Sequence, residues 1–455
     1  VMVQRGQPFR TDLFQKSMEE QVRAVAAQQP EDVGVSSQLL PALGYATLQN
    51  GSPAARFALA LFYGYYPGHA HYDRLNLEVY GYDHPLIPDL GYPETADGFD
   101  PRRSGWLEHT AVHNTVMVNA RKQKLGFGEL VTWQPGGWAQ LVEARTPNAY
   151  PDLVEDYRRA CLLIEVDPTH SYVVDIFRVV GGAQHDWIIH GSQADFESDL
   201  PLSPPRTEGT LAGPDVPYGR FYDDPSLIEG RDGTRYTYYQ GSAFQWLFNV
   251  QQAPLAGPSS VTWRLNRDPA LYPQKPTAGI GLRVHLLGDD ETVFVCDGIP
   301  QRRPGFPETL KWVLRRRSGQ NLTSTFISVF EPFNEGAPVL EGVESLPVAP
   351  DDGSVAVRID HGEFTDLVFW SPQPEADHRF GQWTVSGRAV CERLRAGQVV
   401  AARLMDGTSL QGLTTLSAPG PGRAKIAEVD YEANVITLDA PVLTSDMVGR
   451  WAIVD

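Results

Sequence analysis

The sequence predicts a mainly β protein built from large antiparallel sheets, arranged as a multi-sheet β-sandwich. Three observations lead to this prediction. Short β-branched and aromatic runs recur along the 455-residue chain, turns rich in glycine (42 residues) and proline (36 residues) separate them, and helical spacing of apolar residues is nearly confined to one segment. Strands at this density are typical of sandwiches or barrels, and a chain of this length has room for two or three domains.

The one segment with helical character lies near the start of the chain. Over residues 12–29, apolar residues recur at helical spacing, and Asp12 with Gln15 forms a capping box. Pro30 then ends the pattern. We therefore expect residues 1–35 to be a helical tail or linker whose apolar face packs on other helices or on a sheet.

Strand and turn patterns alternate through the rest of the chain. Alternating or continuous apolar runs predict strands at residues 56–63, 75–80, 171–180, 244–250, 282–287, 292–296, 323–330, 355–359 and 367–370. Proline-rich stretches predict long loops that cover sheet edges or shape a cleft, at residues 199–217, 268–279 and 298–308. A turn-rich stretch at 347–353 divides the main sandwich, residues 36–346, from a smaller C-terminal β domain, residues 347–455.

Charge and composition exclude some partners. The formal net charge of -18 argues against nucleic acid bound by a general basic surface, but it is compatible with an acidic substrate held in a local basic cleft. No apolar run is long enough to span a membrane, and the first residues show no signal-peptide pattern. The three cysteines lack metal-binding spacing, and we expect Cys161 and Cys296 to be buried free thiols.

Residues 68–118 carry the side chains most suited to chemistry. His69 and His71 are two positions apart, so on extended backbone both leave the same face. Asp89 follows an apolar run at a predicted turn, and His113 precedes a β-branched run. Two imidazoles and a carboxylate suit zinc, and the same set on β-strands also suits iron, as in a cupin-like enzyme.

The sequence around these residues resembles that of the heparinase II/III-like polysaccharide lyases, a group that includes heparin, heparan sulfate and alginate lyases. GHAHYDRLNLEVYGYDHPLIPDLGY and HNTVMVN contain the family's His-x-His-x-Asp stretch, Asp-x-Gly turn and His-Asn-Thr-Val in the same order. The resemblance covers most of residues 35–415, including YRRACLLIEV, YVVDIFRVVGG, HDWIIHG and LTSTFISVFEPF. It implies an N-terminal (α/α) toroid, C-terminal antiparallel sheets and an active site between the two.

The resemblance also implies roles for individual residues. It assigns one zinc ion to His71, Asp89 and His113, and it places His69 in the substrate cleft as a catalytic residue. In the family, the toroid supplies a catalytic tyrosine and an Asn/His pair, but most of the toroid is absent from this sequence. We therefore expect activity to need a helical toroid segment or subunit, and homo-oligomerisation is left open.

The function implied is cleavage of an acidic polysaccharide, of alginate or glycosaminoglycan type, by β-elimination in a secreted or periplasmic setting, with a cytoplasmic one left open. A base removes the proton beside the uronate carboxylate, an acid protonates the leaving oxygen, and a third group neutralises the carboxylate. Tyr72 and Tyr92 are expected to line the cleft, and Arg102, Arg103 and His109 to meet the anionic sugar.

Other interpretations of these residues remain open at this point. The tyrosines also fit packed positions, and the arginine pair also fits a solvated loop. We interpret His185 and His190 as hydrogen-bonded sandwich residues and Trp187 as a core residue, whereas Trp106 is a candidate for stacking on a sugar ring. The alternatives to a lyase are a non-catalytic carbohydrate-binding β-domain and a cupin-like metal enzyme.

Overall fold

The computed structural model describes residues 36–52, 55–65, 70–95, 97–227, 235–267, 277–302, 305–335, 337–420, 424–433 and 435–440, together with Ala24. The predicted helix at 12–29 lies outside these residues except for Ala24, which is helical. Strands account for 53% of the structure and helical residues for 6%, which confirms the mainly β prediction. No helix within the described ranges has the length and apolar character needed to cross a membrane.

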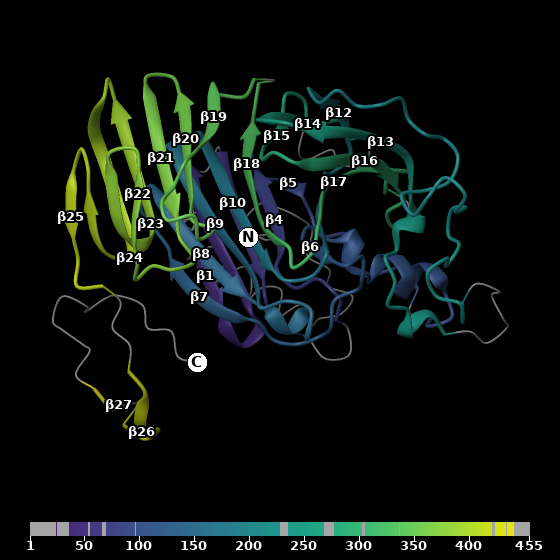
Figure 1. Cartoon of the computed structure of the whole chain (residues 1–455), viewed down its shortest axis with the longest axis horizontal. Coiled ribbons are helices and arrows are strands. Elements are labelled where there is room, and N and C mark those ends of the chain that lie inside the picture. Colours follow the sequence, from purple (N-terminus) through teal and green to yellow (C-terminus); the bar gives the residue numbers. More distant parts are fainter. Residues whose placement is uncertain are drawn as a thin grey trace.

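A central sheet of eight antiparallel strands forms the middle layer, in the order β12-β14-β15-β18-β10-β9-β8-β7. Figure 1 shows β8, β9, β10 and β18 of this sheet in the middle of the molecule. Their bounds are β7 (Glu129–Gln134), β8 (Ala139–Arg145), β9 (Asp156–Asp167), β10 (His170–Val180), β12 (Ala194–Ser198), β14 (Ser259–Leu265), β15 (Gly281–Leu287) and β18 (Thr323–Phe333).

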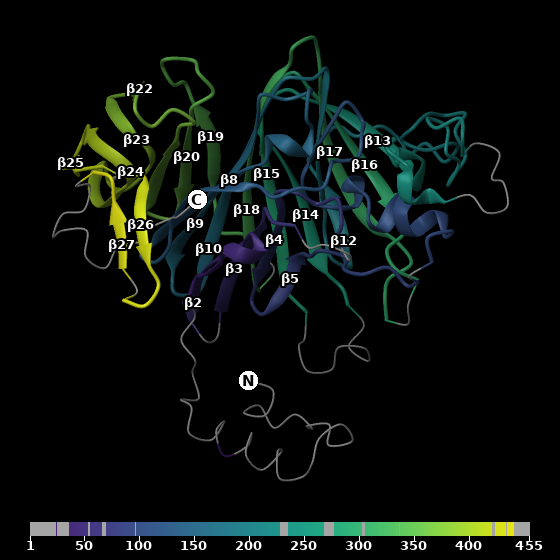
Figure 2. The same ribbon diagram turned by 90° about the horizontal axis from the view of Figure 1, so that it is seen from below.

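Two five-stranded sheets cover one face of the central sheet, with the orders β1-β2-β3-β4-β5 and β13-β16-β17-β11-β6. Figure 2 shows the first of them lying against the central strands. Its strands are β1 (Gln38–Leu40), β2 (Tyr45–Ser52), β3 (Ala55–Phe62), β4 (Asn76–Gly81) and β5 (His84–Ile87). The second comprises β6 (Val116–Val118), β11 (Gln184–His190), β13 (Leu247–Leu255), β16 (Glu291–Gly298) and β17 (Leu310–Ser318).

A seven-stranded sheet covers the other face of the central sheet, in the order β19-β20-β21-β23-β24-β25 with β22 paired to β23. Its strands are β19 (Gly342–Leu346), β20 (Val355–His361), β21 (Phe364–Trp370), β22 (Asp377–Phe380), β23 (Trp383–Arg395), β24 (Gln398–Gln411) and β25 (Thr415–Ser417). A separate hairpin pairs β26 (Ile426–Asp430) with β27 (Val435–Leu438). The short helical turns are η1 (Pro41–Leu43), η2 (Arg103–Leu107), η3 (Thr110–Val112), η4 (Pro147–Ala149), η5 (Tyr236–Tyr238) and η6 (Phe244–Trp246).

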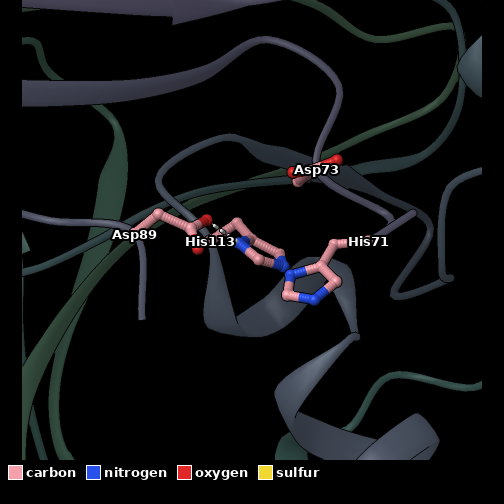
Figure 3. A group of neighbouring side chains, drawn as sticks. All are labelled: His71, Asp73, Asp89 and His113. Atoms are coloured by element: carbon pink, nitrogen blue, oxygen red, sulfur yellow. Dashed lines mark hydrogen bonds and ion pairs between the residues drawn. The ribbon is translucent and has the colours of Figure 1, made fainter. Parts of the chain in front are cut away.

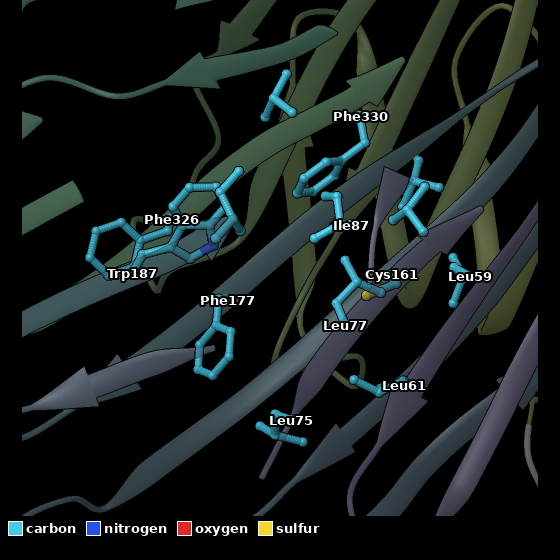
Figure 4. Close-up of a cluster of buried hydrophobic side chains, with 14 of the residues drawn as sticks. Leu59, Leu61, Leu75, Leu77, Ile87, Cys161, Phe177, Trp187, Phe326 and Phe330 are labelled. Atoms are coloured by element: carbon cyan, nitrogen blue, oxygen red, sulfur yellow. The ribbon is translucent and has the colours of Figure 1, made fainter. Parts of the chain in front are cut away.

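The sequence of β9 shows why the central sheet is buried on both faces. Cys161 and Leu163 enter the core shared with the two five-stranded sheets, whereas Leu162 and Ile164 enter the core shared with the seven-stranded sheet. Because side chains alternate between faces, a strand covered on both sides needs a continuous apolar run. Figure 4 shows Cys161 in the first of these cores, beside side chains from strands of several sheets.

Most predicted strands are confirmed. Residues 171–180 and 282–287 correspond closely to β10 and β15, but the strand predicted at 244–250 begins only at Leu247, after the helical turn η6. The three cysteines are all buried and free, as predicted for Cys161 and Cys296. Because β19 pairs with β20, the last large sheet begins at Gly342; the division of the chain at 346/347 stays a prediction.

A buried ion pair lies within the central sheet, and its arginine also bonds to segments outside that sheet. The Arg159 guanidinium on β9 makes two hydrogen bonds to the Asp175 carboxylate on β10, at 2.6 and 2.8 Å, and neither side chain is exposed. Nη1 of Arg159 donates to the carbonyl oxygens of Leu75, at 2.8 Å, and Asn114, at 2.5 Å. This one side chain therefore anchors two segments that lie outside its own sheet.

We predict that Arg159→Met lowers the free energy of unfolding by about 3–5 kcal/mol, because it leaves the Asp175 carboxylate buried without its partner. Denaturant unfolding measures this change. The matched control is Arg145→Met, because the Arg145–Glu129 pair is exposed and such pairs contribute about 0–1 kcal/mol. Equal losses in the two variants would contradict the prediction.

Candidate metal centre

Three segments of the first half of the chain meet at one end of the first five-stranded sheet. His71 lies in the connection that leads into β4, Asp89 lies two residues after β5, and His113 lies between the turn η3 and β6. Asp89 and His113 thus lie near strand ends, as the sequence predicts. The described structure does not include His69.

The Arg74 side chain shapes the segment that contains His71. Its guanidinium is fully buried and donates to the carbonyl oxygen of His71 and to the Asp73 carboxylate, both at 2.7 Å. It also donates to the carbonyl oxygens of Gly64 and Gly126. Because one planar donor group serves four acceptors, the backbone between His71 and Arg74 has a defined course.

The Asp89 carboxylate is held in a tight turn and reaches His113. Its Oδ1 accepts the backbone N–H of Gly91 at 2.6 Å, the Asx-turn pattern expected of aspartate two residues before a glycine. Gly91 has φ +76°, a left-handed conformation that a residue with a Cβ adopts only with strain. Oδ2 of Asp89 accepts from Nδ1 of His113 at 2.8 Å and from the Asn76 amide at 3.4 Å.

The backbone beside His113 is tied to the sheets. Asn114 donates its N–H to Oδ1 of Asn76 at 2.8 Å, and its own side-chain oxygen accepts the N–H of His190 at 2.9 Å. Together with the bond from Arg159 to its carbonyl oxygen, these contacts explain why an asparagine follows the histidine. The imidazole of His113 is 1% exposed.

His71, Asp73, Asp89 and His113 form a cluster in which one potential ligand atom from each residue lies within 4.8 Å of the others. Figure 3 shows the His113 ring between the Asp89 carboxylate and the His71 ring. The two imidazole centroids are 5.3 Å apart. Within the described residues, Nε2 of His113 is buried and has no hydrogen-bond partner.

Mutual electrostatic interactions shift the pKa values of the cluster. Burial alone raises the pKa of Asp89, but the charge and hydrogen bond of His113 outweigh burial and hold this pKa below its usual range. Burial lowers the pKa of His113, yet the Asp89 carboxylate raises it above the ordinary value overall. Burial and the neighbouring charge of His113 both lower the pKa of His71.

These residues fit a zinc ion. Imidazole nitrogens and carboxylate oxygens are ligands that zinc accepts, and the buried Nε2 of His113 is an acceptor that lacks a donor when Nδ1 carries the proton. In this structure Oδ2 of Asp89 accepts from the other ring nitrogen of His113, which is a common support for a metal-bound histidine, whereas the resemblance makes Asp89 itself a ligand. The hydrogen bond fixes the orientation of the His113 ring.

Asp73 is the member of the cluster that sequence reasoning missed as a ligand candidate. The signal was present, since the motif behind the resemblance is His-x-His-x-Asp and Asp73 is its last residue. Asp73 is followed by Arg74, and an adjacent Asp-Arg pair in a sequence is typical of a solvated ion pair, so Asp73 did not stand out as a ligand candidate. In the structure the pair is buried.

The predicted substrate residues fall into two groups. Tyr92 is 37% exposed and its ring stacks at 6.3 Å from that of His71, while Tyr72 and Arg103 are half-buried. Arg102 and His109 are buried instead and bond to other parts of the protein, and their predicted contact with a sugar stays a prediction. Arg102 bonds to Glu94 and to backbone carbonyl oxygens, and His109 bonds through Nε2 to the carbonyl oxygen of Gly241.

The remaining aromatic and histidine predictions are mostly confirmed. Both ring nitrogens of His185 are hydrogen-bonded, to Ser324 and to the carbonyl oxygen of Gly181. His190 differs, because its Nε2 has no hydrogen-bond partner among the described residues. Trp187 is a core residue as predicted, but Trp106 is also fully buried, so it cannot stack on a sugar.

A comparison with protein families identifies this region of the chain. The family described as "Heparinase II/III-like, C-terminal" matches residues 33–277, which is more than half of the chain and includes the whole cluster. The chain belongs to the heparinase II/III-like family. The fold and the order of the motifs that the resemblance implied are consistent with this membership.

Two curated relatives and a solved structure are similar to the chain. An exo-oligoalginate lyase of Saccharophagus degradans is 28% identical over 330 residues, covering 66% of this chain and 39% of the relative. An alginate lyase of Stenotrophomonas maltophilia is 25% identical over 233 residues, covering 45% of this chain and 30% of the relative. The heparan sulfate lyase HepC of Pedobacter heparinus has a TM-score of 0.50 at 14% identity, covering 79% of this chain and 46% of that one, which shows the fold alone. The chain spans less than half the length of these proteins.

Lys122 is a buried cation that contacts Tyr72, the residue after His71, and sequence reasoning did not single it out. Its ammonium lies 4.1 Å from the centroid of the Tyr72 ring and donates to the carbonyl oxygen of Thr237 at 3.4 Å. Burial, which outweighs the attraction of Glu108, lowers its pKa to about 8. The folded protein therefore releases this proton at a lower pH than the unfolded chain does.

We predict that wild-type stability rises relative to Lys122→Met between about pH 8 and pH 10.5, by up to about 3 kcal/mol. In this window the unfolded lysine is still protonated and the folded one is neutral, so raising the pH favours folding. Denaturant unfolding at several pH values measures the difference. Lys124→Met, at an exposed neighbouring lysine, is the control. The prediction is contradicted if the stability difference between wild type and Lys122→Met changes with pH no more than the difference between wild type and Lys124→Met.

Proposed function

We propose that this chain is the β-sheet part of a zinc-containing lyase that cleaves an acidic, uronate-containing polysaccharide by β-elimination. The observation that carries the proposal is the cluster of His71, Asp73, Asp89 and His113 with its unpartnered buried nitrogen. Two alginate lyases among the relatives support alginate as the first substrate to test. Membership of the family favours this function over a cupin-like oxidoreductase.

In this proposal the cluster organises the edge of a substrate cleft. A bound zinc ion stabilises the local fold and adds positive charge near an anionic sugar. Tyr92, exposed and stacked near His71, forms the surface on which a sugar ring packs. His69, two residues before His71, is the proposed proton-transferring group, because an imidazole is suited to moving a proton at neutral pH.

The metal is tested by elemental analysis of the purified chain, which we predict to contain one zinc ion per chain. His113→Gln should lose the zinc and should no longer be destabilised by a chelator, since a metal bound only by the folded state stabilises it. His190→Gln is the matched control, because His190 is also a buried histidine but is not part of the cluster. His69→Ala should also keep the zinc.

Absence of stoichiometric zinc from the wild-type protein would contradict the metal assignment. Loss of zinc from His69→Ala as complete as from His71→Ala would show that the roles of these two histidines are assigned wrongly.

We also propose that turnover needs a helical segment in addition to this chain. The chain spans 39% and 30% of the two alginate lyase relatives, and it offers a credible group for only part of the acid, base and carboxylate-neutralising chemistry. A non-catalytic carbohydrate-binding role is the alternative for the chain by itself.

The prediction is that the 455-residue chain alone, with zinc present, binds alginate oligosaccharides but does not produce the absorbance of an unsaturated uronate. Fusion to, or mixing with, the toroid segment of an alginate lyase relative should restore that signal. Full turnover by the isolated chain would contradict the proposal and would assign the proton transfers to residues such as Tyr72 or Tyr92.

A further inference from the structure

The turn that carries Asp89 is clamped by a residue from a distant loop. Gln301 lies between β16 and β17 and is 2% exposed. Its Nε2 lies within hydrogen-bond distance of three consecutive carbonyl oxygens, those of Leu90, Gly91 (3.2 Å) and Tyr92 (3.4 Å). These carbonyl groups belong to the residues that follow Asp89, so one amide contacts the whole turn.

Further hydrogen bonds connect the same two loops. Glu94 accepts from the backbone N–H of Arg302 at 2.5 Å and from the Arg102 guanidinium at 3.2 Å. Arg102 in turn donates to the carbonyl oxygen of Pro300 at 2.9 Å. Nε1 of Trp106 donates to the carbonyl oxygen of Ile299 at 2.8 Å. The loop after β16 is therefore attached along much of the connection between β5 and η2.

The side-chain amide of Gln301 contacts the turn only as a hydrogen-bond donor. Its Oε1 is buried and lacks a hydrogen-bond partner among the described residues, which costs free energy. The hydrogen bonds of this amide are made through Nε2, which is the end that meets the turn. An apolar side chain of similar size would leave three carbonyl oxygens without this donor.

We propose that Gln301 is a positioning residue of the metal centre. By holding the carbonyl groups of residues 90–92, it keeps the Asp89 carboxylate directed at His113 before a metal binds. Gly91 has a positive φ and open space where a Cβ would lie, so packing of its own does not restrain the turn, and the hydrogen bonds from Gln301 supply restraint from outside. This inference rests on the proposed zinc site and extends the site to a loop far along the chain.

The proposal is tested with Gln301→Glu, which keeps the shape but places a carboxylate oxygen against the carbonyl oxygens, and with Gln301→Ala, which removes the donor without adding charge. Hydrogen exchange of the amides of residues 89–92 is measured on metal-stripped protein. Zinc affinity is measured by competition with a chromogenic chelator. We expect both variants to lose protection in this turn, and zinc to bind about 10- to 100-fold more weakly, as is typical when a residue that supports a metal ligand is removed.

Gln140→Glu is the matched control, because Gln140, on β8 of the central sheet, is also buried and donates to a carbonyl oxygen, that of Gln49 on β2, at 2.9 Å. It should lower the melting temperature while leaving zinc affinity and exchange at residues 89–92 unchanged. Unchanged exchange in both Gln301 variants, or unchanged zinc affinity in them, overturns the proposal. If the wild-type protein binds no zinc, the proposed function fails, and the exchange measurement still decides whether Gln301 holds the turn.

Discussion

The arrangement of the structure depends on the buried guanidinium of Arg159. A charge without water is costly, and the Asp175 carboxylate on the adjacent strand compensates it within the central sheet. The remaining nitrogen faces outward from that sheet and meets the carbonyl oxygens of Leu75 and Asn114. Leu75 leads into β4, and Asn114 follows His113. Hydrogen bonds from this one side chain therefore attach two of the segments that contain cluster residues to the central sheet.

Local sequence predicts this fold well where burial is uniform along a strand. The continuous apolar run in YRRACLLIEV predicts a strand that is covered on both faces, and β9 is such a strand. The order of strands in the sheets is a different matter, since β10 pairs with β18, a strand more than a hundred residues later. Such pairing is determined by the packing of whole layers, and no pattern within either strand encodes it.

The candidate site was predictable to the extent that its residues share a short motif. His71, Asp89 and His113 were found through ligand type and order, and the structure brings their side chains together. The positions of Arg102 and His109 were not predictable. Their burial depends on carbonyl groups at Pro300 and Gly241, which become neighbours only after the chain has folded.

The cluster is therefore positioned mainly by residues that do not belong to it. Arg74 determines the course of the backbone at His71, Arg159 anchors the backbone beside His113, and Gln301 clamps the turn of Asp89. Each of these is a buried polar group whose desolvation offsets most of the free energy of its hydrogen bonds, although removing it alone leaves its buried partners unsatisfied and destabilises the fold. What each group provides is a single geometry for a cluster whose own residues sit in loops. A transplanted 68–118 segment would carry all four cluster residues but would lack the donors from β9 and from the β16–β17 loop, so the motif alone does not specify the geometry of the cluster.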